Sequence, residues 1–110
     1  MEKMARRAML FDYYGGLLNE KQKSIYEDTV TQDMSLSEIG DAEGITRQAV
    51  SEIIKRCDEK LERYERDLGL IRKAEIIEKS IVQINTVASK LEENDRRCIA
   101  DATESIIKEL

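Results

Sequence analysis

The chain has 110 residues and a formal net charge of −5, which argues against indiscriminate binding to nucleic acid because phosphate affinity comes mainly from clustered Lys and Arg. Charged residues make up 37 % of the chain, only 5 % is aromatic and Pro is absent, a mixture that favours an all-α fold. His and glycine-rich nucleotide-binding motifs are also absent, so we predict no enzyme activity, no catalytic residue, no cofactor and no metal site.

Secretion, membrane insertion and disulfide bonding are not indicated. The apolar run AMLF near the N-terminus is interrupted at Asp12, which argues against a signal peptide. No stretch approaches the roughly 20 apolar residues of a membrane span. Cys57 and Cys98 lie far apart on apolar stripes, so we expect reduced thiols in the core. These features predict a soluble, cytoplasmic protein without a membrane span.

Two helices are predicted before residue 31. The first covers residues 3–14, and Gly15 and Gly16 should loosen the backbone after it. Asn19 is the expected N-cap of a second helix that runs to about Val30. The residues expected to face inward are Leu10, Phe11, Tyr14, Ile25 and Tyr26.

A short third helix and a long fourth helix follow. Ser35 and Glu38 form a capping box at the start of the third helix. Gly44 should end that helix with a positive φ, and Thr46 should cap the fourth.

Apolar residues repeat by fours and threes through the rest of the chain, as in a heptad seam. The first run is Val50, Ile54, Cys57, Leu61, Tyr64, Leu68 and Ile71, and the second is Leu70, Ala74, Ile77, Ile81, Ile84, Ala88 and Leu91. Gly69 marks the slip between the runs, where either one helix bends or two helices meet. A last helix should start at Asn94 or Asp95, and its apolar side would carry Ile99, Ala102, Ile106 and Leu110.

The second seam is too wide for one partner strip, because it also carries Ile76, Val82 and Val87. We favour a homodimer formed by the C-terminal helices. The alternative is that the last helix folds back and covers the seam within one subunit. The expected division is a winged-helix-like or sigma-like helix-turn-helix domain at 1–68 and a helical, dimerising segment at 69–110.

A helix-turn-helix corner needs particular residues where its two helices touch, and residues 35–56 supply them. Ile39 followed by Gly40 places an apolar residue before one small enough for a close helix crossing. Gly44 suits the turn. The apolar residues required after the turn and on the inner face of the second helix are Ile45, Val50 and Ile53.

The outward side of the fourth helix carries side chains suited to DNA. The predicted DNA-binding residues are Thr46, Arg47, Gln48, Ser51, Glu52, Lys55 and Arg56. Arg47 can bond guanine O6 and N7, and Gln48 adenine N6 and N7. Lys55 and Arg56 are suited to contact the phosphate backbone. The hydroxyl groups of Thr46 and Ser51 could hold a phosphate at the helix N-terminus, and Glu52 could accept a hydrogen bond from cytosine.

Basic residues are concentrated near this helix. Lys3, Arg6 and Arg7 of the first helix add to this local positive charge. DNA contact should therefore be confined to one face and be salt-sensitive. The alternative is a purely architectural corner, since such corners also occur in helical bundles. Gly40 inside a helix costs about 1 kcal/mol relative to Ala, which a close crossing explains.

About the first two-thirds of the chain resembles the YlxM-like family of helix-turn-helix proteins, through SLSEI, ITRQAVSEIIKR and LERYERDL. The same stretch is similar to the promoter-reading region of bacterial sigma factors. The resemblance implies an all-helical DNA-binding-like domain, a regulatory role and participation in the signal recognition particle pathway, with a component of that particle as a partner. YEDTVTQDM and GDAEG depart from the family pattern, and both lie on the scaffold.

Two functions from different classes remain at this point. The first is a DNA-binding regulatory protein. The second is a helical interaction module of the protein-targeting machinery, in which the acidic surface or the C-terminal bundle binds a protein, or the corner binds a structured RNA.

Overall fold

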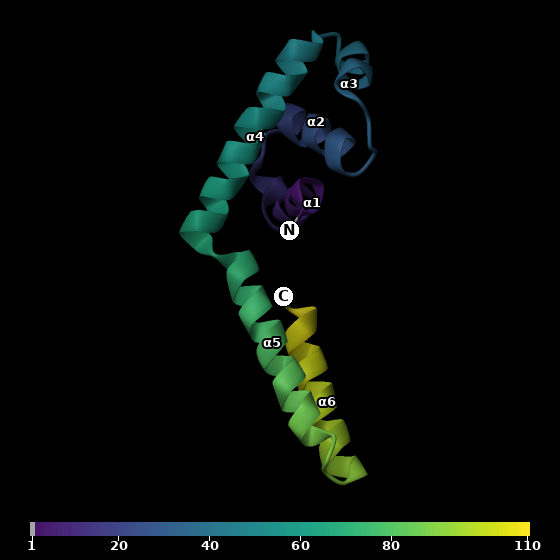
Figure 1. Ribbon diagram of the computed structural model, residues 1–110, viewed down its shortest axis with the longest axis vertical. Helices are drawn as coiled ribbons and strands as arrows, with labels where there is room; N and C mark the ends of the chain where they lie inside the picture. The colour runs from purple at the N-terminus through teal and green to yellow at the C-terminus, as the bar shows by residue number, and fades with distance from the viewer. Residues whose placement is uncertain (1) are drawn as a thin grey trace. The chain divides into compact units, whose positions relative to one another are not determined.

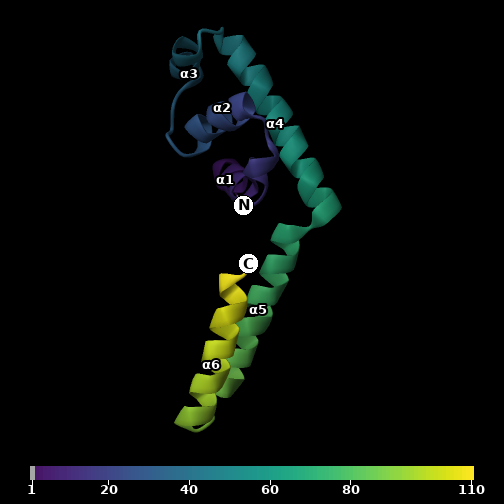
Figure 2. The same ribbon diagram turned by 180° about the vertical axis from the view of Figure 1, so that it is seen from behind.

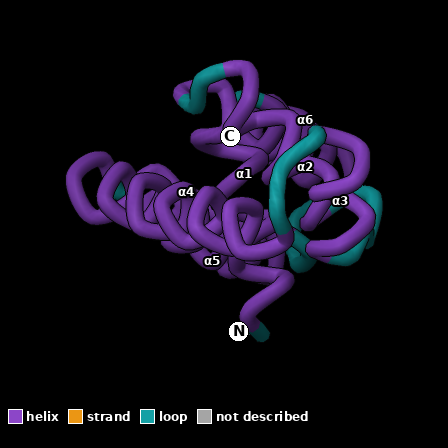
Figure 3. The backbone as a smooth tube through the Cα atoms, turned by 90° about the horizontal axis from the view of Figure 1, so that it is seen from above, coloured by secondary structure: helices purple, strands orange, loops and turns teal. Residues whose placement is uncertain are grey.

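The computed structural model describes residues 2–110 and is all-helical over that range, as predicted (Figure 1). The helices are α1 (Lys3–Tyr14), the 3₁₀ turn η1 (Gly15–Leu17), α2 (Glu20–Val30), α3 (Leu36–Glu43), α4 (Arg47–Leu68), α5 (Leu70–Ala88) and α6 (Glu93–Lys108). The segments that join them are loops and turns (Figure 3). The chain divides into two compact units, one up to Ile71 and one from Arg72 to Leu110.

In the first unit, α1, α2 and α3 lie on one side of α4 (Figures 1 and 2). Their shared core includes the fully buried side chains of Tyr14, Ile25, Tyr26, Ile39, Val50, Cys57 and Leu61. The apolar stripe of α4 supplies one wall of this core, because residues three and four apart fall on the same side of a helix.

The predicted helix starts are confirmed by their caps. The Asn19 side chain accepts a 2.8 Å hydrogen bond from the backbone N–H of Gln22, and the side-chain Oε1 of Gln22 accepts one of 3.3 Å from the backbone N–H of Asn19. Ser35 and Glu38 form the same reciprocal box at α3. These side chains satisfy backbone N–H groups that have no partner inside the helix.

The predicted bounds of the first helix, 3–14, are confirmed, but two neighbouring details are wrong. Gly15 and Gly16 do not loosen the backbone but form η1, in which the N–H of Leu18 donates to the carbonyl oxygen of Gly15. The cap of α6 is Glu92 rather than Asn94 or Asp95, because the Glu92 carboxylate accepts from the backbone N–H of Asp95 at 3.1 Å. Glu is not among the usual N-cap residues, which explains the misplaced start.

Two helices meet at Gly69, which has a φ of 65° and ends α4. Leu68 is 47 % exposed, so the first seam does not continue to that residue. The hydroxyl of Tyr14 accepts from the N–H of Leu70 and donates to Glu65, whose Oε1 also accepts from the N–H of Ile71. Tyr14 and Glu65 therefore bind the backbone N–H groups of Leu70 and Ile71, which are still part of the first unit.

In the second unit, α6 folds back beside α5 (Figures 1 and 2). Thr103 of α6 is buried and donates a 3.2 Å hydrogen bond to the side chain of Asn85. The seam residues Ala74, Ile81 and Ala88 are also buried. No helix within residues 2–110 is both long enough and apolar enough to cross a membrane.

The cover that α6 provides is incomplete. Ile84 and Leu91 of the predicted seam remain 46 % and 43 % exposed. Ile106 and Leu110, expected on the apolar side of the last helix, are also exposed. Cys98 is exposed, which corrects the prediction of a core thiol, because the half-buried Ile99 next to it faces α5 and successive helix residues point about 100° apart.

Candidate nucleic-acid interface

The corner between α3 and α4 is closed by a backbone contact at Gly40. The N–H of Ile45 donates a 3.0 Å hydrogen bond to the carbonyl oxygen of Gly40. A Cβ atom at Gly40 would lie only 2.8 Å from the carbonyl oxygen of Ile45. Gly44 has a φ of 70°, as the turn requires. The close helix crossing predicted from the Ile39-Gly40 pair is therefore present.

The start of α4 is fixed by Thr46. Its Oγ1 accepts a 3.0 Å hydrogen bond from the backbone N–H of Ala49. Val50 and Ile54 then turn into the core. These contacts determine which side of α4 faces away from the domain.

The outward side of α4 carries all the side chains that the sequence suggested for DNA. We call the set the recognition flank, and its members, all exposed, are Thr46, Arg47, Gln48, Ser51, Glu52, Lys55 and Arg56. Arg47, Ser51 and Lys55 follow one another at intervals of four, so they form a row along the helix. Within residues 2–110, no ion pair involves Arg47, Lys55 or Arg56. DNA contact by this flank stays a prediction.

Two of the basic residues expected to extend this surface are engaged elsewhere. Arg6 forms a bidentate pair with Glu62, with both N···O distances at 3.0 Å. Arg7 does the same with Asp58, at 2.9 and 2.7 Å. Their charges are largely matched by α4, so the local basic surface is smaller than the residue count suggested. Lys3 is exposed and forms no ion pair with any described residue.

Asp58 joins three helices beneath the recognition flank. Its Oδ1 accepts from Arg7 of α1 and, at 2.5 Å, from the hydroxyl of Tyr26 on α2. Burial, and then the hydrogen bond to Asp58, raise the pKa of Tyr26 well above its ordinary value of 10.0. The hydrogen bond to Asp58 likewise raises the pKa of Arg7. Sequence reasoning missed this network because its members are 32 and 51 positions apart in the chain.

A cleft of about 540 Å³ opens beside the flank. It is lined by Lys3, Arg7, Thr29, Leu36, Ser51, Ile54, Lys55 and Asp58. Ser51 and Lys55 belong to both the cleft and the recognition flank. Ile54 and Asp58 of α4 complete its share of the lining, and the rest comes from α1, α2 and α3. No local sequence pattern could bring these four helices together.

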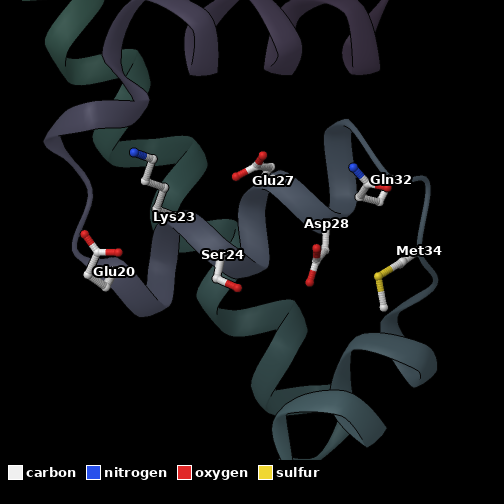
Figure 4. A pocket seen from close by; sticks show the side chains of 7 residues that line it. All are labelled: Glu20, Lys23, Ser24, Glu27, Asp28, Gln32 and Met34. Atoms are coloured by element: carbon white, nitrogen blue, oxygen red, sulfur yellow. The ribbon is translucent and has the colours of Figure 1, made fainter.

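A second hollow, of about 630 Å³, lies over α2 and the segment that leads to α3 (Figure 4). Its lining is Glu20, Lys23, Ser24, Glu27, Asp28, Gln32 and Met34. Three carboxylates against one ammonium group make it unsuited to phosphate. No group of three or more His, Cys, Asp or Glu within residues 2–110 is arranged to hold a metal ion.

Comparison with known proteins relates this arrangement to one family. The sequence profile described as "Putative helix-turn-helix protein, YlxM / p13 like" matches residues 1–100. A UPF0122 protein of Clostridium perfringens is 37 % identical over 111 residues, which span 97 % of this chain and 98 % of that protein. A UPF0122 protein of Listeria innocua is 42 % identical over 89 residues, 81 % of each chain. One from Symbiobacterium thermophilum is 45 % identical over 71 residues, 64 % of this chain and 66 % of that protein.

Proposed function

This chain belongs to the family described as "Putative helix-turn-helix protein, YlxM / p13 like", and we propose that it is a cytoplasmic, non-enzymatic regulatory protein that binds DNA through the recognition flank. The observation that carries the proposal is the flank itself. Its three cationic side chains are exposed and form no ion pair within the described chain, beside a corner that Gly40 closes.

In this proposal, the first turn of α4 contacts the bases. A helix that enters the major groove contacts base edges with its N-terminal residues, and Arg47 and Gln48 stand there. Arg47 would donate to guanine O6 and N7, and Gln48 would pair with adenine N6 and N7. Lys55 and Arg56, two turns on, would contact phosphate and set the register of the helix without specifying sequence.

The net negative charge of the whole chain is consistent with binding through this one flank. A net charge of −5 weakens attraction to phosphate wherever the flank is not engaged. Binding would then depend on one face and on the bases that Arg47 and Gln48 can satisfy.

Selection of binding sites from random duplex DNA, at two salt concentrations, tests this function. The parent protein should enrich a consensus at both concentrations and lose affinity with salt. Arg47→Ala combined with Gln48→Ala should abolish the consensus with the fold intact by circular dichroism. Failure of the parent protein to enrich any sequence refutes the proposed base reading.

The second part of the proposal divides the chain at residues 1–68 and 69–110 and assigns the latter to homodimer formation. In the second unit, α5 and α6 leave several large apolar side chains exposed: Ile76, Val82, Ile84, Val87, Leu91, Ile106, Ile107 and Leu110. Exposed apolar surface on this scale is typical of an interaction site. A second copy of α5, with the same three-four spacing, is the occupant we propose, and a dimer would carry two recognition flanks for paired half-sites.

A second candidate function is supported by the same apolar surface. A helical interaction module of the protein-targeting machinery would use α5 and α6 to bind a component of the signal recognition particle pathway. This candidate needs neither Arg47 nor Gln48. A parent protein that stays monomeric, enriches no DNA and binds a purified component of that pathway through these helices would favour it over the DNA reader.

A further inference from the structure

The cleft beside the recognition flank has a positive rim. Lys3 from α1 and Lys55 from α4 both line it, and both residues are exposed. Neither forms an ion pair within residues 2–110. Two ammonium groups from helices far apart in the sequence thus line one opening.

The only carboxylate in the lining does not offset this charge. Asp58 already accepts two hydrogen bonds from Arg7 and one from Tyr26. Its negative charge is matched by the guanidinium of Arg7, which also lines the cleft. What the cleft offers to a ligand is therefore the charge of its two lysines.

The cleft and the recognition flank are continuous. Ser51 and Lys55 stand one turn apart on α4 and belong to both surfaces. A DNA strand that follows the flank would reach the cleft without leaving the protein surface. The hydroxyl of Ser51 can donate a hydrogen bond, and the half-buried Leu36 offers apolar surface suited to the carbon face of a deoxyribose.

We propose that this cleft is a phosphate subsite that holds a backbone phosphate of bound DNA between Lys3 and Lys55. The inference rests on the proposed function and extends it to α1, which lies outside the helix-turn-helix corner. The ligand is a phosphodiester, contacted by two ammonium groups and the hydroxyl of Ser51. Such a contact adds affinity without sequence preference.

The salt dependence of DNA affinity tests the subsite. Each neutralised phosphate contributes about −0.9 to the slope of log affinity against log salt. Lys3→Gln should make the slope shallower by about one and leave the consensus unchanged. A fourfold rise in salt should therefore weaken the parent protein about 3.5-fold more than the variant.

Two matched variants serve as controls. Lys21→Gln removes the same charge from an exposed position of α2 outside the cleft, and it should leave the slope at the parent value. Lys3→Arg keeps the charge and should restore the slope. Because Lys3 is exposed and makes no ion pair with a described residue, thermal melting of Lys3→Gln should match that of the parent protein.

The outcomes separate the two proposals. If the parent protein binds its consensus and Lys3→Gln leaves the slope unchanged, the subsite is refuted and the proposed function stands. An altered consensus in Lys3→Gln refutes the phosphate assignment as well. If calorimetry at constant ionic strength shows that inorganic phosphate binds the free parent protein in a Lys3-dependent manner while the slope is unchanged, the ligand is a free anion. If the parent protein binds no DNA, both proposals fail.

Discussion

The Cα of Gly40 on α3 approaches the carbonyl oxygen of Ile45 so closely that a Cβ atom there would lie 2.8 Å from it. The obstacle is backbone, which cannot rotate away as a flexible side chain can. The position of α3 across the start of α4 therefore requires that residue 40 have no side chain, which is true only of Gly.

Gly40→Ala should consequently destabilise the protein even though Ala is the better helix former. Forced overpacking costs about 1–3 kcal/mol, and helix propensity returns about 1 kcal/mol, so we expect a net loss of up to about 2 kcal/mol in the free energy of unfolding. Urea denaturation measures it. Gly16→Ala is the matched control, because a Cβ there meets nothing within 4 Å. Equal stability of the two variants would contradict the close crossing.

Tyr26→Phe should lower stability at neutral pH. It removes a 2.5 Å hydrogen bond to the carboxylate of Asp58, and hydrogen bonds to charged groups contribute about 1.5–3 kcal/mol. Tyr13→Phe is a suitable control, since the Tyr13 hydroxyl makes no side-chain hydrogen bond with the described chain. Chemical denaturation at pH 7 compares them. Similar losses in both variants would remove the special role of Asp58.

The same hydroxyl should make stability depend on alkaline pH. The pKa of Tyr26 is raised in the folded protein, so above pH 10 the unfolded chain loses this proton while the folded chain keeps it. The contribution of the Tyr26 hydroxyl to the free energy of unfolding is thus fully present below the unfolded pKa of 10.0 and is lost as pH rises above it. Denaturation between pH 8 and 11 should show a decline that is shallower in Tyr26→Phe than in the parent protein. Parallel curves would contradict it.

Val87→Asn should weaken the proposed homodimer without unfolding the subunit. Val87 is 67 % exposed in the single chain, so polar substitution should cost the monomer less than about 0.5 kcal/mol. Burial in a symmetric interface would involve the residue twice, and losing about 1.5 kcal/mol per copy raises the dissociation constant about a hundredfold. Sedimentation equilibrium measures it. Lys79→Asn, which removes no apolar side chain, is the control, and a monomeric parent protein would rule out the interface.

The helical elements of the first unit were accessible from the sequence because their signals are local. Ser35 bonds Glu38 three positions on, and Gly44 alone supplies the positive φ that ends α3. Such signals act within one helical turn, so no knowledge of the tertiary fold is needed to recognise them.

The rest could not be read locally. The pair between Arg7 and Asp58 spans 51 positions, and so the sequence suggested a free cation where the structure has a matched one. Cys98 lies on an apolar stripe, but periodicity cannot say which side of that stripe a neighbouring helix covers. The cleft beside the recognition flank depends on four helices at once, and no single stretch of the sequence specifies how these helices meet.

The network at Asp58 has a consequence for how a duplex would be accommodated. Arg7 and Tyr26 hold α4 just beyond Lys55, and Thr46 holds its first turn, so the helix is anchored at both ends of the recognition flank. Because the helix is already ordered in the free protein, it would lose less conformational entropy on binding DNA than a flexible segment would. Any change of shape on binding would then occur in the DNA. DNA sequences that bend at little energetic cost would be preferred, even at base pairs that no side chain contacts.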